Sequence, residues 1–305
     1  MKRRDFLEIA ALAGGTLAAT SLTVSDSLSD EAVLGSSAKH SSLETQITKE
    51  VKSSRIGFGT GMRGVQRQSD LTRAGWTKGI ELLRFAYDRG IRLFDCADCY
   101  GTHFVVAEAL KDKHRDSYVL VSKVWLRPGN LPELERLPPH ISVRRFLKEL
   151  RTDYIDILQL HCIDSGKWTT ELAEAMESME QLKQKGIIRA HGISSHSNAS
   201  AEVAAETNWC DVVHVRINGE GMNMDGAKED AVKRVEEGVR ITKKIHDAGK
   251  GVIAMKVLGE GKMAHDPGMR KRSTRFVAGL DSIDVMIAGF TEKEHITEFI
   301  DNVYG

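Results

Sequence analysis

Short runs of β-branched and aliphatic residues alternate with segments of helical periodicity from about residue 55 onward. In one such segment, Val143, Phe146, Leu147 and Leu150 recur at steps of three and four residues, which places them on one face of a helix. Alternation of this kind is typical of parallel βα units. We expect strands at residues 55–59, 91–96, 118–123, 154–161, 188–194, 211–217, 251–257 and 284–289.

The expected helices carry end signals that agree with this division of the chain. Gly90, Gly186 and Gly249 follow helical segments at positions where a left-handed residue ends a helix well. Eight strand–helix units in roughly 250 residues fit an α/β fold of the (β/α)₈ TIM barrel type better than an open doubly wound sheet. In this barrel the chemistry lies at the carboxyl ends of the strands.

Polar and ionisable residues gather at those expected strand ends. Each stands where a strand should be leaving the apolar core, so we expect these side chains to meet on one face of the barrel. They are Asp95 and Tyr100 after the second strand, Lys123 at the end of the third, His161 at the end of the fourth, and Ser194 and Ser195 at the end of the fifth.

The first 22 residues have the layout of an export signal. Arg3 and Arg4 are followed by Phe6-Leu7 and by an apolar stretch rich in Ala and Gly, which is typical of a twin-arginine leader. The stretch is short for a membrane span, so we expect none to remain after export. We therefore expect a signal peptide at 1–22, a polar linker at 23–54 and the barrel at 55–305. The signal predicts the twin-arginine machinery as a partner and a periplasmic or extracellular location. The sequence leaves open whether and where the signal peptide is cleaved.

Charge and cysteine content narrow the partners. Lys plus Arg and Asp plus Glu number 43 each, so no global basic field favours nucleic acid, and a small molecule is the expected partner. Four cysteines are too few for a disulfide scaffold in a chain of 305 residues. Cys96 and Cys99 could still form a disulfide, or could bind a metal with Cys162 and His103, although one Cys-x-x-Cys pair is a weak metal signal.

Five stretches, taken in order, resemble the aldo-keto reductase family from about residue 55 to residue 303. They are "GIRLFDCADCYG" (90–101), "VLVSKVW" (119–125), "LKELRTDYIDILQLH" (147–161), "KGIIRAHGISS" (185–195) and "IAGFTEKEHITEF" (287–299). The resemblance implies a catalytic tetrad of Asp95, Tyr100, Lys123 and His161. It also implies that Cys96 and Cys99 occupy positions of no chemical role.

These residue types suit hydride transfer between a nicotinamide and a carbonyl carbon. The alkoxide that forms needs a proton donor and a polar environment on its oxygen, for which Tyr100 is the candidate. We expect Lys123 to favour the ionised form of the tyrosine and Asp95 to pair with the lysine. His161 would orient or polarise the substrate carbonyl, whether this belongs to an aldehyde, a ketone or a sugar.

The resemblance implies NAD or NADP bound across the barrel mouth, and the sequence has no Gly-x-Gly-x-x-Gly turn opening a helix after a strand. The carboxamide would meet Ser194 and Ser195, the second in place of the usual Asn. The pyrophosphate would lie near Leu258, Gly259, Glu260 and Gly261. The adenosine end would lie between Gly289 and Glu298, near Thr291 and His295.

Three departures from the family pattern leave the choice between NAD and NADP open. Phe299 replaces an Asn expected at the adenine, His295 replaces an Arg that often reads the 2′-phosphate, and "RING" (216–219) lacks the aromatic that commonly stacks on nicotinamide. We therefore expect a preference for NADP of about tenfold at most. A much larger preference would make Arg270, Lys271, Arg272 and Arg275 the candidate phosphate readers.

Two further expectations concern the substrate pocket and an alternative function. The sequence ends at Gly305, soon after the last expected helix, so we expect an open substrate pocket without a long C-terminal loop. The same departures allow a second function, a non-catalytic barrel that binds a dinucleotide or a partner.

Overall fold

The computed structural model describes residues 44–305, so the expected signal peptide and residues 23–43 of the expected linker lie outside the described residues. Eight parallel strands close a barrel in chain order, with the last strand pairing to the first, which confirms the expected fold. The strands are β3 (Ile56–Gly59), β4 (Leu93–Asp95), β5 (Val119–Val124), β6 (Ile155–Ile163), β7 (Ile188–Ser195), β8 (Val212–Arg216), β9 (Gly251–Met255) and β10 (Val285–Ala288).

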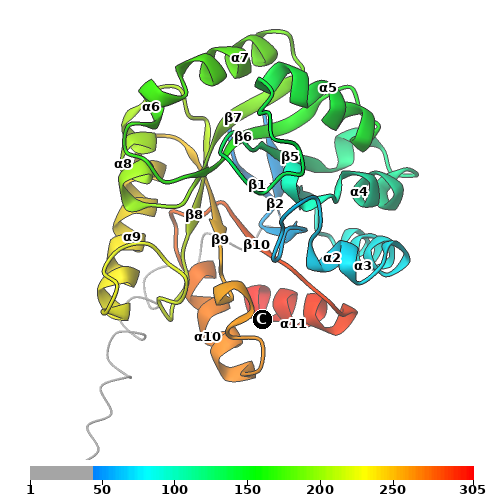
Figure 1. Cartoon of the computed structure of the whole chain (residues 1–305). Helices are drawn as coiled ribbons and strands as arrows, with labels where there is room; N and C mark the ends of the chain where they lie inside the picture. The colour runs from blue at the N-terminus through cyan, green and yellow to red at the C-terminus, as the bar shows by residue number, and fades with distance from the viewer. Residues whose placement is uncertain (1–43) are drawn as a thin grey trace, which may run out of the picture. The chain divides into compact units, whose positions relative to one another are not determined.

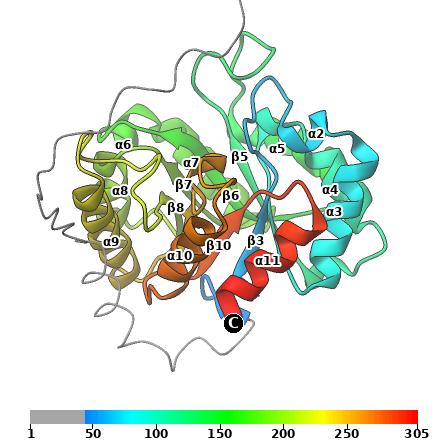
Figure 2. The same cartoon turned by 90° about the horizontal axis from the view of Figure 1, so that it is seen from below.

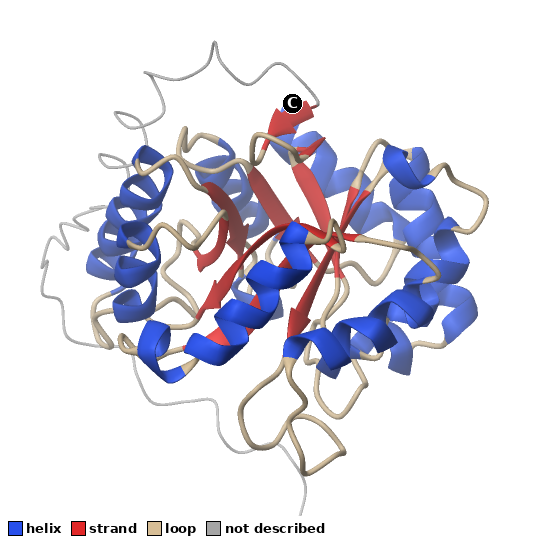
Figure 3. Cartoon of the chain, turned by 90° about the horizontal axis from the view of Figure 1, so that it is seen from above, coloured by secondary structure: helices blue, strands red, loops and turns tan. Residues whose placement is uncertain are grey.

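Helices surround the strands, as Figures 1 and 3 show. The last helix packs against both α10 and α3, so it joins the end of the helical ring to its beginning (Figure 2). Within residues 44–305, no helix has the length and apolar character needed to cross a membrane. The helices are α2 (Asp70–Arg73), α3 (Trp76–Asp88), α4 (His103–Leu110), α5 (Pro139–Leu150), α6 (Trp168–Glu171), α7 (Ala173–Gln184), α8 (Asn198–Glu206), α9 (Ala231–Asp247), α10 (Pro267–Ala278) and α11 (Lys293–Tyr304).

Helix ends follow the local signals of the sequence. Gly90, Gly186 and Gly249 take φ values of 92°, 69° and 75°, a conformation that only glycine adopts without strain. The side chain of Asp230 caps α9 by accepting a hydrogen bond from the Lys233 amide at 2.9 Å. These local choices set where each chain segment turns back to the next strand.

The barrel has two apolar layers, because successive strand residues point to opposite faces. Phe94, Leu120 and Leu158 face outward and pack under the helices. Leu93 and Val121 belong to a separate buried cluster that fills the barrel interior. A filled interior leaves the strand ends as the places where polar side chains can gather.

A short hairpin lies at the amino ends of the strands, in the range where the sequence predicts the end of a polar linker. Its strands are β1 (Glu44–Gln46) and β2 (Lys52–Ser54). Ile47 and Val51 between them are buried in the interior cluster. A Cβ placed on Gly251, the first residue of β9, would lie 2.5 Å from the Ile47 carbonyl oxygen. The hairpin therefore packs against the barrel, and two apolar residues in a polar stretch do not predict this contact.

Candidate active site

The four residues of the expected tetrad lie together at the carboxyl ends of neighbouring strands. Asp95 ends β4, Lys123 and His161 lie near the ends of β5 and β6, and Tyr100 lies in the 3₁₀ turn Asp98–Tyr100. The Lys123 ammonium pairs with Asp95 and donates to the Cys96 carbonyl oxygen at 2.9 Å. The Tyr100 hydroxyl lies 3.2 Å from Nε2 of His161, and Lys123 Nζ lies 5.3 Å from the centre of the tyrosine ring.

The surroundings of the site shift the pKa values of Asp95 and Tyr100 in opposite directions. Burial is the largest single influence and would raise the pKa of Asp95, but Lys123 and His214 together outweigh it and hold that pKa below its ordinary value. Burial, with Asp95 next in effect, raises the pKa of Tyr100 well above its ordinary value. Lys123 is not among the largest influences on the pKa of Tyr100, and its charge is paired with Asp95. Tyr100 is therefore a protonated donor near neutral pH.

His161 is a neutral ring between polar and aromatic neighbours. Burial and then Lys123 lower the pKa of His161 well below its ordinary value. The Trp125 ring meets it edge-on with centroids 5.3 Å apart, and the Cys99 sulfur lies 3.7 Å from Nδ1. Nε2 is left facing the tyrosine hydroxyl. A neutral imidazole with its proton on Nε2 can donate one hydrogen bond to a carbonyl oxygen.

Two glycines that the sequence analysis did not single out confine the Tyr100 ring. A Cβ placed on Gly61 would lie 2.1 Å from Cε2 of the ring, and one on Gly64 would lie 2.3 Å from Cδ1. Gly101, next in the chain, has φ of 67° and no room for a side chain against the Arg67 carbonyl oxygen. The available signal was the glycine pair just beyond the first barrel strand, although spacing alone does not say what the glycines face.

Asp98 anchors the turn that carries Tyr100. Its buried carboxylate accepts hydrogen bonds from Arg145 on α5 at 2.6 Å and from Arg67 at 3.3 Å. Arg67 is also paired with Glu133 in the loop after β5. Three segments distant in sequence therefore fix the backbone from which the tyrosine projects, and no local pattern indicates this.

The same network continues to the strand that carries Lys123. Arg145 donates to Glu149 at 2.9 Å, and Glu149 lies 2.7 Å from Nδ1 of His103. Nε2 of His103 lies 2.8 Å from the hydroxyl of Ser122, the neighbour of Lys123 in β5. Both ring nitrogens of His103 are thus engaged in a structural network.

The metal alternative gains no support from the described part of the chain. No group of three or more His, Cys, Asp or Glu among residues 44–305 is placed to hold a metal ion. Cys96, Cys99 and Cys162 are free thiols, and burial raises the pKa of the first two to about 12 and of the third to about 11. Protonated thiols are poor metal ligands and poor nucleophiles.

His214 is a second polar residue that the sequence analysis did not select. It lies inside β8, and its Nε2 is 3.3 Å from Oδ1 of Asp95, without the alignment of a hydrogen bond. Burial lowers the pKa of His214, although Asp95 acts in the opposite direction. The available signal was a single histidine between two valines in the middle of a strand.

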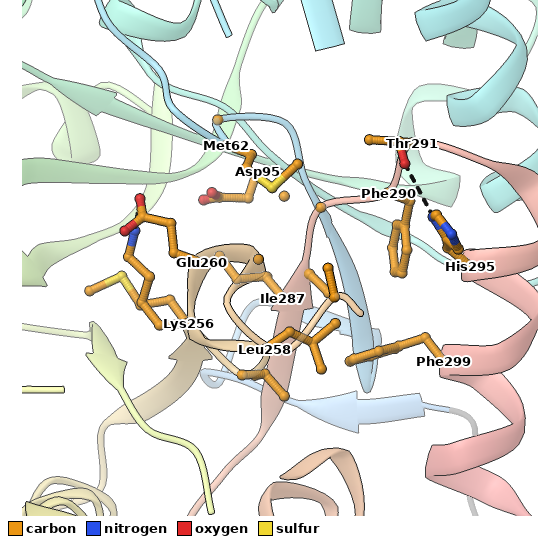
Figure 4. Close-up of a pocket in the computed structure, with 18 of the residues that line it drawn as sticks. Met62, Asp95, Lys256, Leu258, Glu260, Ile287, Phe290, Thr291, His295 and Phe299 are labelled. Carbon is orange, nitrogen blue, oxygen red and sulfur yellow. Dashed lines mark hydrogen bonds and ion pairs between the residues drawn. The ribbon is translucent and has the colours of Figure 1, made fainter. Parts of the chain in front are cut away.

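A cavity of about 260 Å³ opens beside three residues of the tetrad, without His161 among its lining residues, and runs along the ends of β9 and β10 to α11. Asp95, Tyr100 and Lys123 line one end, and Glu298 and Asn302 line the other. Figure 4 shows Asp95 and Met62 on one side, Thr291, His295 and Phe299 on the other, and Leu258 and Ile287 between them. The cavity thus connects three residues of the tetrad with residues of α11.

The structure divides the predicted cofactor residues into two groups. Ser194, Ser195 and Gly259 do not line this cavity; all three are buried, and the Ser195 hydroxyl bonds to Ser197 O and Ser200 Oγ at 2.9 and 2.8 Å. The predicted residues that do line it are Leu258, Gly261, Gly289, Thr291, His295 and Glu298, together with Glu260.

The far end of the cavity has features that suit an anion. Glu292 is the N-cap residue of α11, and its side chain does not hydrogen-bond to the first amides of that helix. Helix N-terminal amides without a side-chain cap can bind an anion. Thr291 Oγ1 lies 3.2 Å from Nδ1 of His295 beside them. Arg270 also lines the cavity, but its guanidinium is held by Glu298 at 2.8 and 2.9 Å. A dinucleotide phosphate would fit this end, with one arginine already partly neutralised.

A protein with this barrel, this tetrad and this cavity matches one known family. The model of the aldo/keto reductase family matches residues 55–298, and the chain belongs to that family. The match covers all eight strands of the barrel and every residue of the tetrad.

Individual relatives are more distant. The chain is 34% identical over 157 residues to aldo-keto reductase YhdN of Bacillus subtilis, covering 48% of this chain and 45% of that protein. It is 25% identical over 234 residues to aldo-keto reductase AFTS1 of Alternaria alternata, covering 66% and 61%. The chain thus spans about half the length of the first relatives that it matches.

Solved structures share the fold. Aldo-keto reductase AKR11C1 of Bacillus halodurans superposes with a TM-score of 0.65 at 21% identity, over 86% of this chain and 91% of the other. An aldo/keto reductase of Klebsiella pneumoniae, in complex with NADP and acetate, superposes with a TM-score of 0.60 at 21% identity, over 86% and 89%.

Proposed function

We propose that the protein is an NAD(P)-dependent oxidoreductase that interconverts a carbonyl and an alcohol. The observation that carries this proposal is the protonated hydroxyl of Tyr100, 3.2 Å from a neutral His161 and beside the Lys123–Asp95 pair. Family membership and the long cavity leading away from this group support it. The substrate is a small aldehyde, ketone or sugar.

The tetrad would work as a proton donor with a fixed orientation. The bound nicotinamide supplies the hydride to the carbonyl carbon. The carbonyl oxygen, held by Tyr100 and His161, takes the electron pair of the broken C=O π bond and receives the proton of the tyrosine hydroxyl. Lys123, fixed by Asp95 and the Cys96 carbonyl, stabilises the phenolate that remains until solvent reprotonates it.

The long cavity is the proposed dinucleotide site. Gly261 and Gly289 would let the backbone approach the pyrophosphate, and the first amides of α11, which have no side-chain cap from Glu292, would face a phosphate. We expect a preference for NADP of about tenfold at most, because Glu298 competes for Arg270 and His295 is a weak phosphate partner. Fluorescence titration of NADH and NADPH at one ionic strength measures it, and a thousandfold preference would contradict it.

The test of the activity is oxidation of NADH or NADPH by the protein with benzaldehyde as a generic substrate. Tyr100→Phe removes the proton donor and should lower kcat by about a hundredfold or more, with cofactor binding retained. Tyr154→Phe is the matched control, because that hydroxyl bonds Asp116 at 2.7 Å near the amino end of β6. Full activity in Tyr100→Phe would contradict the mechanism, and tight cofactor binding without turnover on any carbonyl would favour the non-catalytic barrel.

We also propose export by the twin-arginine route, supported by the order Arg3-Arg4, Phe6-Leu7 and an apolar stretch in the sequence. Export by this route suits a protein that folds around a cofactor before it crosses the membrane. The test is fractionation of bacterial cells that express the full chain. The protein should reach the exported fraction, and replacing Arg3 and Arg4 by Lys should retain it inside; equal distribution of both forms would contradict the proposal.

A further inference from the structure

Basic side chains that belong to no part of the tetrad rim the half of the barrel mouth from β5 to β9. Arg127 lies in the loop after β5, Arg216 ends β8, and Lys256 follows β9. Between them, Cys162 and His196 stand at the ends of β6 and β7. Because β5 to β9 are consecutive around the barrel, these residues share one side of the mouth, next to His161.

Arg127 reaches from its own loop across to the end of β6. Its Nη1 donates to the Cys162 carbonyl oxygen at 2.8 Å and pairs with Asp164 at 2.9 Å. Cys162 has φ of 58°, a left-handed backbone turn directly after His161. The Cys162 sulfur in turn lies 3.4 Å from Nε2 of His196. The Arg127 guanidinium is therefore fixed at the backbone of Cys162, the residue that follows His161 in the chain.

Arg216 is the more buried cation. Its side chain is 21% exposed, and its Nη1 pairs with Asp225 at 3.3 Å. The buried Nε has no hydrogen-bond partner among residues 44–305. A guanidinium offers five N–H donors, and a buried donor without a partner costs stability, so this side chain retains capacity for an anion.

Lys256 continues the rim on the cavity side. It lines the cavity beside the tetrad, and its ammonium pairs with Glu260 at 2.6 Å, with φ of 61° at the lysine itself (Figure 4). An ammonium has three donors, so one carboxylate does not satisfy it.

The field at the centre of this group is positive, although each of the three cations touches one carboxylate. After burial, the largest influences on the pKa of Cys162 are Lys123, Arg216, Arg127 and Lys256, and all of them lower it. Burial and then Arg216, with Lys256 and Arg127, lower the pKa of His196 to about 3. The charges that act most strongly on Cys162 and His196 are therefore positive, although Asp225, the partner of Arg216, is itself largely buried.

We propose that the substrate carries an acid group, a carboxylate or a phosphate monoester, close to its reacting carbonyl. Arg216 and Arg127 bind this anion, and Lys256 adds to the field. Tyr100 and His161 hold the carbonyl oxygen at the same time, so the two ends of the substrate are oriented together. This inference rests on the proposed function, which it narrows to acidic carbonyl compounds.

The experiment compares substrates that differ only in charge. 4-Formylbenzoate and 4-formylbenzamide have the same ring, aldehyde and shape, and glyceraldehyde 3-phosphate with glyceraldehyde separates phosphate from carboxylate recognition. The wild-type kcat/KM for one or both acids should exceed that of the neutral partner by about tenfold or more. Arg216→Gln should remove most of this ratio, and Arg216→Lys should retain part of it. Arg240→Gln, an exposed substitution on α9, is the control and should leave the ratio unchanged.

Equal rates for acid and neutral partner in the wild-type protein, or a ratio that survives both Arg216→Gln and Arg127→Gln, would overturn the inference while the proposed function stands. If no aldehyde is reduced, the proposed function fails, and calorimetric titration with benzoate and benzamide still tests the anion site. Benzoate binding that Arg216→Gln weakens would support the site, and absence of benzoate binding would overturn it.

Discussion

At the scale of single residues, steric confinement positions Tyr100 as much as hydrogen bonding does. Its hydroxyl has His161 as a neighbour, but its ring is placed by Gly61 and Gly64, where no side chain could stand. Lys123 and Asp95 are held by charge in a buried site, where breaking the pair would leave an uncompensated charge. The catalytic geometry therefore depends on residues that have no reactive group.

Gly61→Ala should displace the Tyr100 ring, because the new Cβ would lie 2.1 Å from Cε2. A shift of about 1 Å at the proton donor costs about a hundredfold in rate, so kcat should fall by that order. Gly166→Ala is the control, since its Cβ would meet the nearest atom at 3.4 Å. Kinetics and thermal unfolding of both variants check the prediction, which an unchanged kcat in Gly61→Ala would refute.

His196 should make stability depend on pH. Its pKa is lowered to about 3 in the folded state, so between the ordinary value of 6.5 and about 3 the unfolded chain binds a proton that the folded chain does not. Stability from this group is complete above 6.5 and is lost as the pH falls, by about 1.4 kcal/mol per pH unit at most. Asp284, whose pKa burial raises to about 6, acts in the opposite direction.

The variant His196→Gln isolates the histidine, because Asp284 affects both proteins equally. The unfolding free energies of variant and wild type are measured in urea from pH 7.5 to 4.5. As the pH falls, the variant should become more stable relative to the wild type. His114→Gln, with a side chain that is 82% exposed, should show no such shift. Parallel curves for His196→Gln and wild type would exclude the linkage.

At the scale of elements, an ionic network holds the turn that carries Tyr100, in addition to the turn's own hydrogen bond from the Tyr100 amide to the Ala97 carbonyl oxygen. Asp98 bonds Arg145 of α5 and Arg67 of the loop after β3, and the network continues through Glu149 and His103 to β5. Loops at the mouth of a barrel need such cross-links, because they have no ladder of their own. The network ties the proton donor to the strand of its lysine.

Asp98→Asn should weaken this anchor. The substitution leaves two arginines without their buried charge partner, so unfolding free energy should fall by about 1–3 kcal/mol and kcat by roughly tenfold. Glu133→Gln removes only the half-exposed partner of Arg67 and should cost less than about 1 kcal/mol. Urea unfolding and kcat of the two variants provide the comparison, and equal effects would argue against a positioning role for Asp98.

At the scale of the whole molecule, the two ends of the barrel have separate tasks. The site occupies the carboxyl ends of the strands, and the hairpin covers the amino ends with Ile47 and Val51. Ile47→Ala should lower the unfolding free energy by about 2–4 kcal/mol through the cavity it creates, with kcat/KM unchanged. Val232→Ala, at an exposed position of α9, is the control. A loss of activity without loss of stability would contradict this separation.

The sequence by itself determined the barrel and the polar residues at its strand ends, and the resemblance to the aldo-keto reductase family singled out the tetrad among them. Strand periodicity, helix-ending glycines and polar residues at strand ends are local signals, and a parallel barrel brings all strand ends to one face whatever the detail of packing. Asp95, Lys123 and His161 were predictable for this reason, since their positions follow from where each strand stops.

Only the tertiary structure decided the rest, because it depends on which distant segments approach each other. The glycines against Tyr100, the partners of Asp98 and the burial of Ile47 are contacts between residues far apart in sequence. The raised pKa of Tyr100 follows from burial and then from the charge of Asp95, which spacing does not reveal. Ser195 shows the limit from the other side: its strand end is where the sequence predicts it, but its hydroxyl is held by Ser197 and Ser200 instead of facing the cavity, because side-chain direction is set by local hydrogen-bond competition in three dimensions.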